Sequence, residues 1–296
     1  MLVREAMNVK KILLTGAGGF VGMRIVQHLQ GRYELITFPK GVLSRADLSE
    51  IRAFVMAAAP DAIIHTAAIA DMGVCEANPE DSWRSNVLLT ETLCSAAQEL
   101  RAKIVCYSSD QVYNGCDPLS GPYCEDIPLT PVNVYGRHKL EAEQRALRNL
   151  PDAVGLRLTW MYDLPDSRMR QNTGLPLNLL NACREANVVR AATHECRGVT
   201  YVWDVVRNIE KALALPGGIY NFGCGNALSS HALFLAFARA MNLSDPDRWI
   251  LPDADRFAAQ PRNLVMDGTR AASHGIHFPD STAGFREALC HPFRTP

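Results

Sequence analysis

The sequence predicts an α/β protein with a doubly wound parallel sheet and a smaller, partly helical C-terminal portion. Short apolar runs alternate with helical patterns through residues 11–162, which is typical of parallel strands joined by crossover helices. The first run ends in a glycine-rich turn that leads into a helical pattern. Beyond residue 162 the alternation loosens, and 296 residues are enough for one large or two smaller domains.

The glycine-rich turn follows the apolar run Lys11–Thr15 and precedes apolar residues at helical spacing. A dinucleotide pyrophosphate needs small residues at such a turn and backbone N–H groups at a helix N-terminus. The alternative is a glycine turn without a ligand, which the flanking strand and helix disfavour. We therefore predict a Rossmann-type dinucleotide-binding unit. Its expected cofactor-binding residues are Gly16, Gly18, Gly19, Phe20, Val21 and Gly22.

The second strand, over residues 33–38, bears on the choice of cofactor. NAD-binding sheets usually carry a carboxylate at the end of this strand to hold the ribose hydroxyls. Here the strand ends in Phe38-Pro39-Lys40, and Glu34 stands at its start. Lys40, with Arg45, would instead meet a 2′-phosphate, so we predict NADP, with NAD as the alternative. Otherwise Lys40 is a solvated loop charge.

Next come a helix from Asp47 or Ser49 to Ala59, a third strand over 62–68 and a long helix over 78–100. The third strand runs into Ala67 and Ala68, whose small side chains would let the cofactor approach the backbone. His65 is more typical of a packed strand-end histidine than of an acid or base.

The fourth strand, over residues 103–108, ends in a serine pair, and open α/β sheets carry their chemistry at such strand ends. After a Pro- and Gly-bearing loop, a helix carries Tyr135 and Lys139, which are four residues apart and share one face. A fifth strand follows at 154–158. We expect a dinucleotide-binding domain over 1–162, with its core continuing around 188–222, and a mostly substrate-binding portion over 163–296.

In the later part of the chain, helical patterns cover residues 175–186, 203–213 and 230–241, and a strand covers 219–222. Ser229 or Ser230 is expected to cap the last of these helices.

Composition excludes several classes of function. The formal net charge is -1 without a basic block, which disfavours nucleic acid and anionic membranes as partners. No apolar run approaches the ~20 residues that span a bilayer. The nine cysteines include no Cys-x-x-Cys pair, so we expect no metal site and reduced thiols in a cytoplasmic protein.

The glycine spacing Gly16-x-x-Gly19-x-x-Gly22, Ser109 and the Tyr135-x-x-x-Lys139 pair resemble the pattern of extended short-chain dehydrogenase/reductases. More narrowly, the chain is similar to the dTDP-4-dehydrorhamnose reductase group, densely to about residue 162 and thinly after it. The matching stretches are 65–68, 108–113, 128–143, 156–162, 218–222 and 261–264.

This resemblance implies roles for individual residues. Tyr135 would be the general acid, Lys139 would supply positive charge beside it and hold the nicotinamide ribose, and Ser109 would donate to the reacting oxygen. Further implied contacts are Asp47 and Leu48 to adenine, Asn86 in support of the cofactor site, and Ser109, Asp110, Gln111 and Arg262 to substrate. Asp47 is otherwise a helix cap, Asn86 a solvent-facing amide and Arg262 a surface ion-pair residue.

The expected function is reduction of the 4-keto group of a nucleotide-linked deoxy sugar. Related nucleotide-sugar 4,6-dehydratases use an acidic pair beside the catalytic hydroxyl residue, where this chain has Asp110-Gln111. Because an amide cannot remove a C–H proton, a dehydratase is disfavoured. The reductase group often has an aromatic residue where Gln111 stands, so the substrate pocket is expected to differ from that group's. The alternatives are a nucleotide-sugar epimerase with retained NAD and a non-catalytic NADP-binding regulatory subunit. The resemblance also implies a homodimer through the helices at 78–100 and 133–149.

Overall fold

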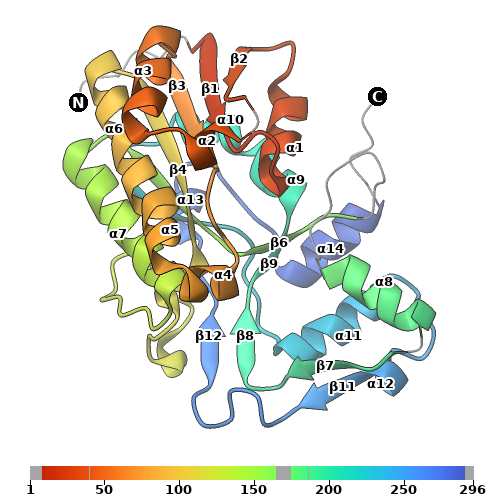
Figure 1. Cartoon of the computed structure of the whole chain (residues 1–296). Coiled ribbons are helices and arrows are strands. Elements are labelled where there is room, and N and C mark those ends of the chain that lie inside the picture. Colours follow the sequence, from red (N-terminus) through yellow and green to blue (C-terminus); the bar gives the residue numbers. More distant parts are fainter. Residues whose placement is uncertain (1–8, 40, 165–174, 186, 291–296) are drawn as a thin grey trace. The chain divides into compact units, whose positions relative to one another are not determined.

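The computed structural model describes residues 9–39, 41–164, 175–185 and 187–290 (Figure 1). A parallel sheet of six strands forms its centre, in the order β10-β5-β4-β3-β1-β2. β1 pairs in parallel with β2 and β3, and β3 pairs in parallel with β4. This arrangement confirms the predicted fold class. The strands are β1 (Lys11–Thr15), β2 (Glu34–Thr37), β3 (Ala62–His65), β4 (Lys103–Ser109), β5 (Val154–Leu158) and β10 (Gly218–Phe222).

Helices α3, α6 and α7 lie side by side on one face of this sheet, and α1 lies on the other side (Figure 1). Strand side chains such as Leu13, Ile63 and Ile104 are fully buried against Val55 and Leu93 from these helices. Burial of each such side chain contributes about 1.5–3 kcal/mol, so the apolar faces hold the sheet in place. The helices of this region are α1 (Phe20–Leu29), α2 (Val42–Arg45), α3 (Leu48–Ala58), α4 (Met72–Ala77), α6 (Leu89–Leu100) and α7 (Val134–Asn149).

The helix predicted over 78–100 is present but is not a uniform α-helix. It consists of α5 (Pro79–Trp83), a π-helical turn (Arg84–Leu88) and α6. A π-helical turn inserts an extra residue into the hydrogen-bond ladder and occurs often at functional sites. Apolar periodicity does not register such a change, so the turn was not predicted.

The chain forms two compact units that interleave along the sequence. The first comprises residues 1–112, 131–157 and 206–220, and the second comprises 113–130, 158–205 and 221–296. The loop at 113–130 and the segment 188–205 therefore belong with the second unit, in contrast to the expected boundaries. Both segments lie between sheet elements in sequence, but their contacts are with the later part of the chain.

The second unit contains short paired strands and helices around an aromatic core. Phe237 and Phe285 stack with their ring centres 4.0 Å apart, and the Tyr162 ring packs against both. The strands pair as β6 (Trp160–Tyr162) with β9 (Val199–Tyr201), β7 (Val189–Ala192) with β11 (Ile250–Asp253), and β8 (Glu195–Arg197) with β12 (Arg262–Leu264). The helices are α8 (Leu175–Glu185), α11 (Ser230–Ala240), α12 (Pro246–Trp249), α13 (Thr269–Ala272) and α14 (Ser281–Cys290).

Among the later helices, the cap of α11 agrees with the prediction, whereas the helix predicted over 203–213 is divided. Ser229 caps α11 by accepting a hydrogen bond from the Ala232 N–H, as expected. The pattern over 203–213 is two short helices, α9 (Val202–Arg207) and α10 (Ile209–Leu213), divided at Asn208. Throughout the part of the chain described here, no helix is both long and apolar enough to cross a bilayer.

Candidate active site

The glycine-rich turn between β1 and α1 is closely packed on one side and open on the other. Gly16 has a φ of +71°, and a Cβ there would lie 2.6 Å from Thr66 Oγ1. A Cβ on Gly22 would lie 2.0 Å from the Gly16 carbonyl oxygen. A Cβ on Gly18 would meet no atom within 4 Å. On the side of the turn at Gly18 no side chain of the described residues covers the backbone, so a ligand can approach the backbone there.

The N-terminus of α1 has features that favour an anion. Its N-cap is Gly19, no side chain caps it, and its first turn contains no acidic residue. The backbone N–H groups and the helix dipole therefore present partial positive charge at the open turn. These residues fit the pyrophosphate of a dinucleotide, as the sequence pattern predicts.

The end of β3 is fixed to β1 and α6 through His65. Thr90 donates its one hydroxyl proton to the Asn86 carbonyl, so it accepts from His65 Nε2 at 3.0 Å. His65 Nδ1 then accepts from Thr15 Oγ1 at 2.7 Å. Burial lowers the pKa of His65 to about 3, with a smaller contribution from the Lys139 charge. His65 is therefore a neutral, fully hydrogen-bonded structural residue, as its position in the strand suggested.

Asn86 holds the loop that follows β3. Its side chain is fully buried, accepts from the Ile69 N–H at 3.2 Å and donates to the Ile69 carbonyl at 3.0 Å. The same amide donates to Ser82 Oγ. Asn86 therefore does not face solvent, and its hydrogen bonds secure the backbone just beyond Ala67 and Ala68.

The end of β2 has the residues that bear on cofactor choice. Glu34 is the first residue of the strand and lies 3.7 Å from Lys11 Nζ, at the amino end of the sheet. The Phe38 ring packs on Phe54 with centroids 4.5 Å apart. Lys40 lies outside the described residues. The Arg45 guanidinium folds back over Gly41, within 3.5 Å of the place of a Cβ there.

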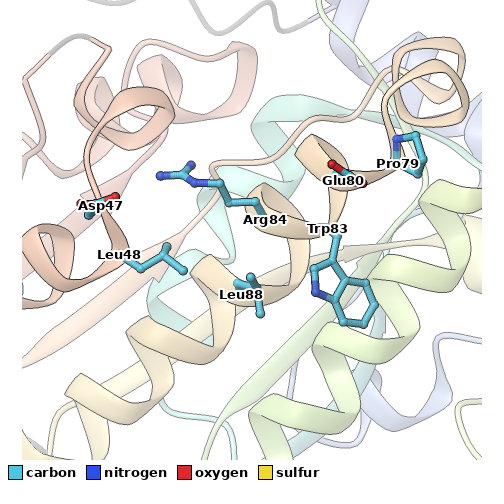
Figure 2. A pocket seen from close by; sticks show the side chains of 7 residues that line it. All are labelled: Asp47, Leu48, Pro79, Glu80, Trp83, Arg84 and Leu88. Carbon is cyan, nitrogen blue, oxygen red and sulfur yellow. The ribbon is translucent and has the colours of Figure 1, made fainter.

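Asp47 and Leu48, predicted to contact adenine, stand at the start of α3. Asp47 is the N-cap and forms a capping box with Glu50. Both residues line a surface hollow of about 540 Å³ (Figure 2). Arg84 points toward them and donates to the Leu43 and Ala46 carbonyls. The remaining residues of the hollow are Pro79, Glu80, Trp83 and Leu88.

Helix α7 brings Tyr135 and Lys139 to the carboxyl end of β4. Asn133 caps the helix by accepting from the Gly136 N–H, and Glu76 accepts from the Val134 N–H at 2.8 Å. Lys139 Nζ donates to the Tyr107 carbonyl at 2.8 Å and lies 5.8 Å from the centre of the Tyr135 ring. Helix and strand thus place the cation beside the phenol.

Ser109, Asp110 and Gln111 form a hydrogen-bonded chain at the same strand end. Ser109 Oγ donates to Asp110 Oδ1 at 3.2 Å, and Gln111 Nε2 donates to the same oxygen. Gln111 Oε1 accepts from Asn133 Nδ2 at 3.1 Å. All three residues are buried, and Gln111 links the strand end to the cap of α7.

The protonation of the site follows from burial. Burial raises the pKa of Tyr135 above its ordinary value, whereas a hydrogen bond with Ser109 acts in the opposite direction. Burial lowers the pKa of Lys139 to about 8, against the opposing effects of Cys106 and Glu143. Near neutral pH the site therefore holds a protonated tyrosine beside a lysine that is mostly charged, which suits proton donation by the tyrosine.

Arg262 lies in the second unit, in β12. Its guanidinium forms an ion pair with Glu195 of β8 and lies 4.2 Å from the centre of the Phe257 ring. The expected ion pair of Arg262 is present, but it is largely buried rather than at the surface, with side chains 14% and 9% exposed. A diphosphate contact stays a prediction.

Sequence patterns did not point to Glu76, which accepts from the Val134 N–H, or to Glu143, which forms an ion pair with Arg157. The spacing of Glu143, one turn beyond Lys139, was the one available signal among them. Across the ranges that the structure describes, no group of three or more His, Cys, Asp or Glu residues could hold a metal ion.

Comparison with known proteins agrees with this geometry. A dTDP-4-dehydrorhamnose reductase of Mycolicibacterium smegmatis is 31% identical over 290 residues, covering 95% of this chain and 84% of the relative. Methionine adenosyltransferase 2 subunit beta of Xenopus tropicalis is 29% identical over 299 residues, covering 95% and 87%. The crystal structure of a Bacillus anthracis dTDP-4-dehydrorhamnose reductase in complex with NADP superposes with a TM-score of 0.82 at 22% identity, covering 96% of this chain and 99% of that one.

The similarity is spread over nearly the whole chain rather than confined to the glycine-rich turn. The family model described as RmlD substrate binding domain matches residues 10–291, which cover most of both compact units. The predicted resemblance to the dTDP-4-dehydrorhamnose reductase group is confirmed at this level, and the chain belongs to the RmlD substrate binding domain family.

Proposed function

We propose that this chain is an NADP-dependent reductase of the 4-keto group of a nucleotide-linked deoxy sugar. The observation that carries the proposal is that Ser109, Tyr135 and Lys139 come together at the carboxyl end of β4, in the parallel sheet whose β1 leads into the open glycine turn. A relative with 31% identity is named as a dTDP-4-dehydrorhamnose reductase, which supports the substrate class.

In the proposed reaction Tyr135 gives its phenolic proton to the carbonyl oxygen of the sugar. Its raised pKa keeps the proton on the phenol until charge develops on that oxygen. Ser109 turns its hydroxyl from Asp110 toward the substrate and donates a hydrogen bond to the same oxygen, which stabilises the charge. The Lys139 ammonium lowers the cost of the tyrosinate that remains.

A bound dihydronicotinamide supplies the hydride in this scheme. The glycine turn and the N-terminus of α1 would hold its pyrophosphate, and Lys139 would donate to its ribose. The absence of a carboxylate at the end of β2 leaves room for a 2′-phosphate, and the nearby Arg45 would pair with it. These features favour NADP over NAD.

The decisive experiment measures NADPH absorbance while the purified protein is incubated with each of several nucleotide-linked 4-keto-6-deoxy sugars. We expect oxidation with at least one sugar, and a loss of about 10²–10⁴-fold in kcat in Tyr135→Phe. Tyr220→Phe is a matched control, because it also removes a buried phenolic hydroxyl, one that donates to the Pro216 carbonyl four residues earlier in the chain. Equal rates for Tyr135→Phe and the wild-type protein would refute the assigned role.

A second candidate is a non-catalytic regulatory subunit, favoured by the 29% identity to methionine adenosyltransferase 2 subunit beta. NADPH binding without oxidation of any sugar, and without effect of Tyr135→Phe, would favour this function. Tightly bound NAD in the purified protein would instead favour an epimerase.

A further inference from the structure

A buried ion pair lies directly behind the Tyr135 and Lys139 pair. Arg157 of β5 donates to Glu143 of α7 through Nη2 at 2.7 Å and through Nε at 3.0 Å. Their side chains are only 3% and 5% exposed. Burial of two charges costs free energy that their attraction rarely exceeds, so an apolar pair of similar size would serve stability equally well. The pair therefore calls for a role beyond stability.

Glu143 is connected to both sides of the candidate active site. It lies one helical turn after Lys139 on α7, and it accepts a hydrogen bond from Ser108 Oγ. Ser108 stands between Tyr107, whose carbonyl accepts from Lys139, and Ser109. A shift of the Glu143 carboxylate would consequently move the strand end that orients Lys139 and Ser109.

A small cavity of about 20 Å³ is lined by Lys139, Glu143 and the end of β4. Its lining residues include the polar Lys139, Glu143, Ser108 and Thr90, together with apolar residues such as Leu147 and Ile219. A cavity of at least about 10–15 Å³ with several polar partners holds one water molecule. The volume thus fits a single water and excludes a larger ligand.

The Lys139 ammonium has hydrogen-bonding capacity to spare toward this cavity. It carries three N–H groups, and the Tyr107 carbonyl is the one hydrogen-bond acceptor that the described residues provide for them. A water in the cavity can accept from Nζ and donate to a Glu143 oxygen. The negative carboxylate also opposes the effect of burial on the pKa of Lys139.

We propose that Glu143 is a positioning residue for Lys139, which it holds and keeps cationic through one buried water in this cavity. The inference rests on the proposed function insofar as Lys139 serves the proposed reaction. The water between Lys139 and Glu143 can nevertheless be observed in a protein that shows no activity. Arg157 and Ser108 hold the carboxylate in place through hydrogen bonds to its two oxygens.

Two variants separate this role from simple support of the fold. Glu143→Gln keeps the shape but removes the charge, and Glu141→Gln is its matched control on the same helix. Glu141 pairs with Arg145 at the surface, away from the cavity. Gly155→Ala retains the ion pair and adds a methyl group to the cavity wall, 2.5 Å from the end of the flexible Ile219 side chain and in ordinary contact with Glu143 Cγ at 4.0 Å.

The first measurement is a high-resolution crystal structure of the wild-type protein. We expect one ordered water within hydrogen-bond distance of Lys139 Nζ and a Glu143 oxygen, and no water there in Gly155→Ala. A dry cavity in the wild-type protein would overturn the inference whatever the activity of the protein.

The second measurement is the pH dependence of NADPH affinity, followed by cofactor fluorescence, together with kcat where a substrate is found. NADPH affinity should fall at high pH as Lys139 loses its proton, and this fall is the alkaline limb of the pH profile. Removal of a nearby negative charge disfavours the lysine cation, so the alkaline limb should move to lower pH by about one unit in Glu143→Gln. It should stay in place in Glu141→Gln. Gly155→Ala should shift the limb in the same direction.

An unchanged limb in both Glu143→Gln and Gly155→Ala would refute the positioning role even in an active reductase. A shifted limb in a protein that oxidises no NADPH would instead refute the proposed function and leave the positioning role in place. If Glu143→Gln fails to fold, Gly155→Ala decides the outcome, because it retains all charges.

Discussion

Gly18 in the turn and Gly22 in the first turn of α1 are expected to respond differently to substitution by alanine. In Gly22→Ala the new Cβ would lie 2.0 Å from the Gly16 carbonyl oxygen, which is backbone and cannot rotate away. Overpacking of this kind costs about 1–3 kcal/mol, and the gain in helix propensity returns up to about 1 kcal/mol. We therefore expect a lower free energy of unfolding by about 1–2 kcal/mol. In Gly18→Ala the Cβ meets no atom, so stability should change by less than about 0.5 kcal/mol.

NADPH affinity should separate the two positions further. A methyl group at Gly18 occupies the open side of the turn, where the pyrophosphate is expected to receive backbone hydrogen bonds. Loss of one hydrogen bond to a charged group costs about 1.5–3 kcal/mol, or about 10- to 100-fold in Kd. Urea unfolding and cofactor fluorescence titration measure the two effects. Unchanged affinity in a stable Gly18→Ala protein would refute this location of the pyrophosphate.

Three further predictions concern cofactor choice, pH and assembly. Arg45→Ala should weaken NADPH binding and leave NADH binding unchanged, since only the former has a 2′-phosphate; equal losses in parallel titrations would contradict this. His65 has a pKa of about 3 when folded and about 6.5 when unfolded, so acidification below about 6.5 protonates the unfolded chain first and costs about 2 kcal/mol of stability by pH 5. Urea unfolding at pH 7 and pH 5 should show this loss, and a smaller loss in His65→Gln. Light scattering should detect a homodimer formed through the helices at 78–100 and 133–149, and a species of only 32.6 kDa would exclude it.

Local sequence patterns were sufficient to predict the strands and helices around the candidate active site, because each pattern lies within a few consecutive residues. The strand, turn and helix over residues 11–29 follow from apolar periodicity and from the spacing of the glycines between them. The face shared by Tyr135 and Lys139 follows from helical spacing alone. The same spacing could not reveal the π-helical turn at Arg84–Leu88, because one extra residue in a hydrogen-bond ladder leaves the apolar pattern almost unchanged.

The sequence by itself thus determined the fold class, the glycine turn and the residues that resemble a reductase site. Only the tertiary structure decided what these residues contact. The Lys139 acceptor is a backbone carbonyl from β4, Gln111 joins a helix cap, and Glu143 pairs with Arg157 of another strand. Such partners depend on which strands become neighbours and how deeply each group is buried. Both are properties of the packed chain, and they set the charge and orientation of the site.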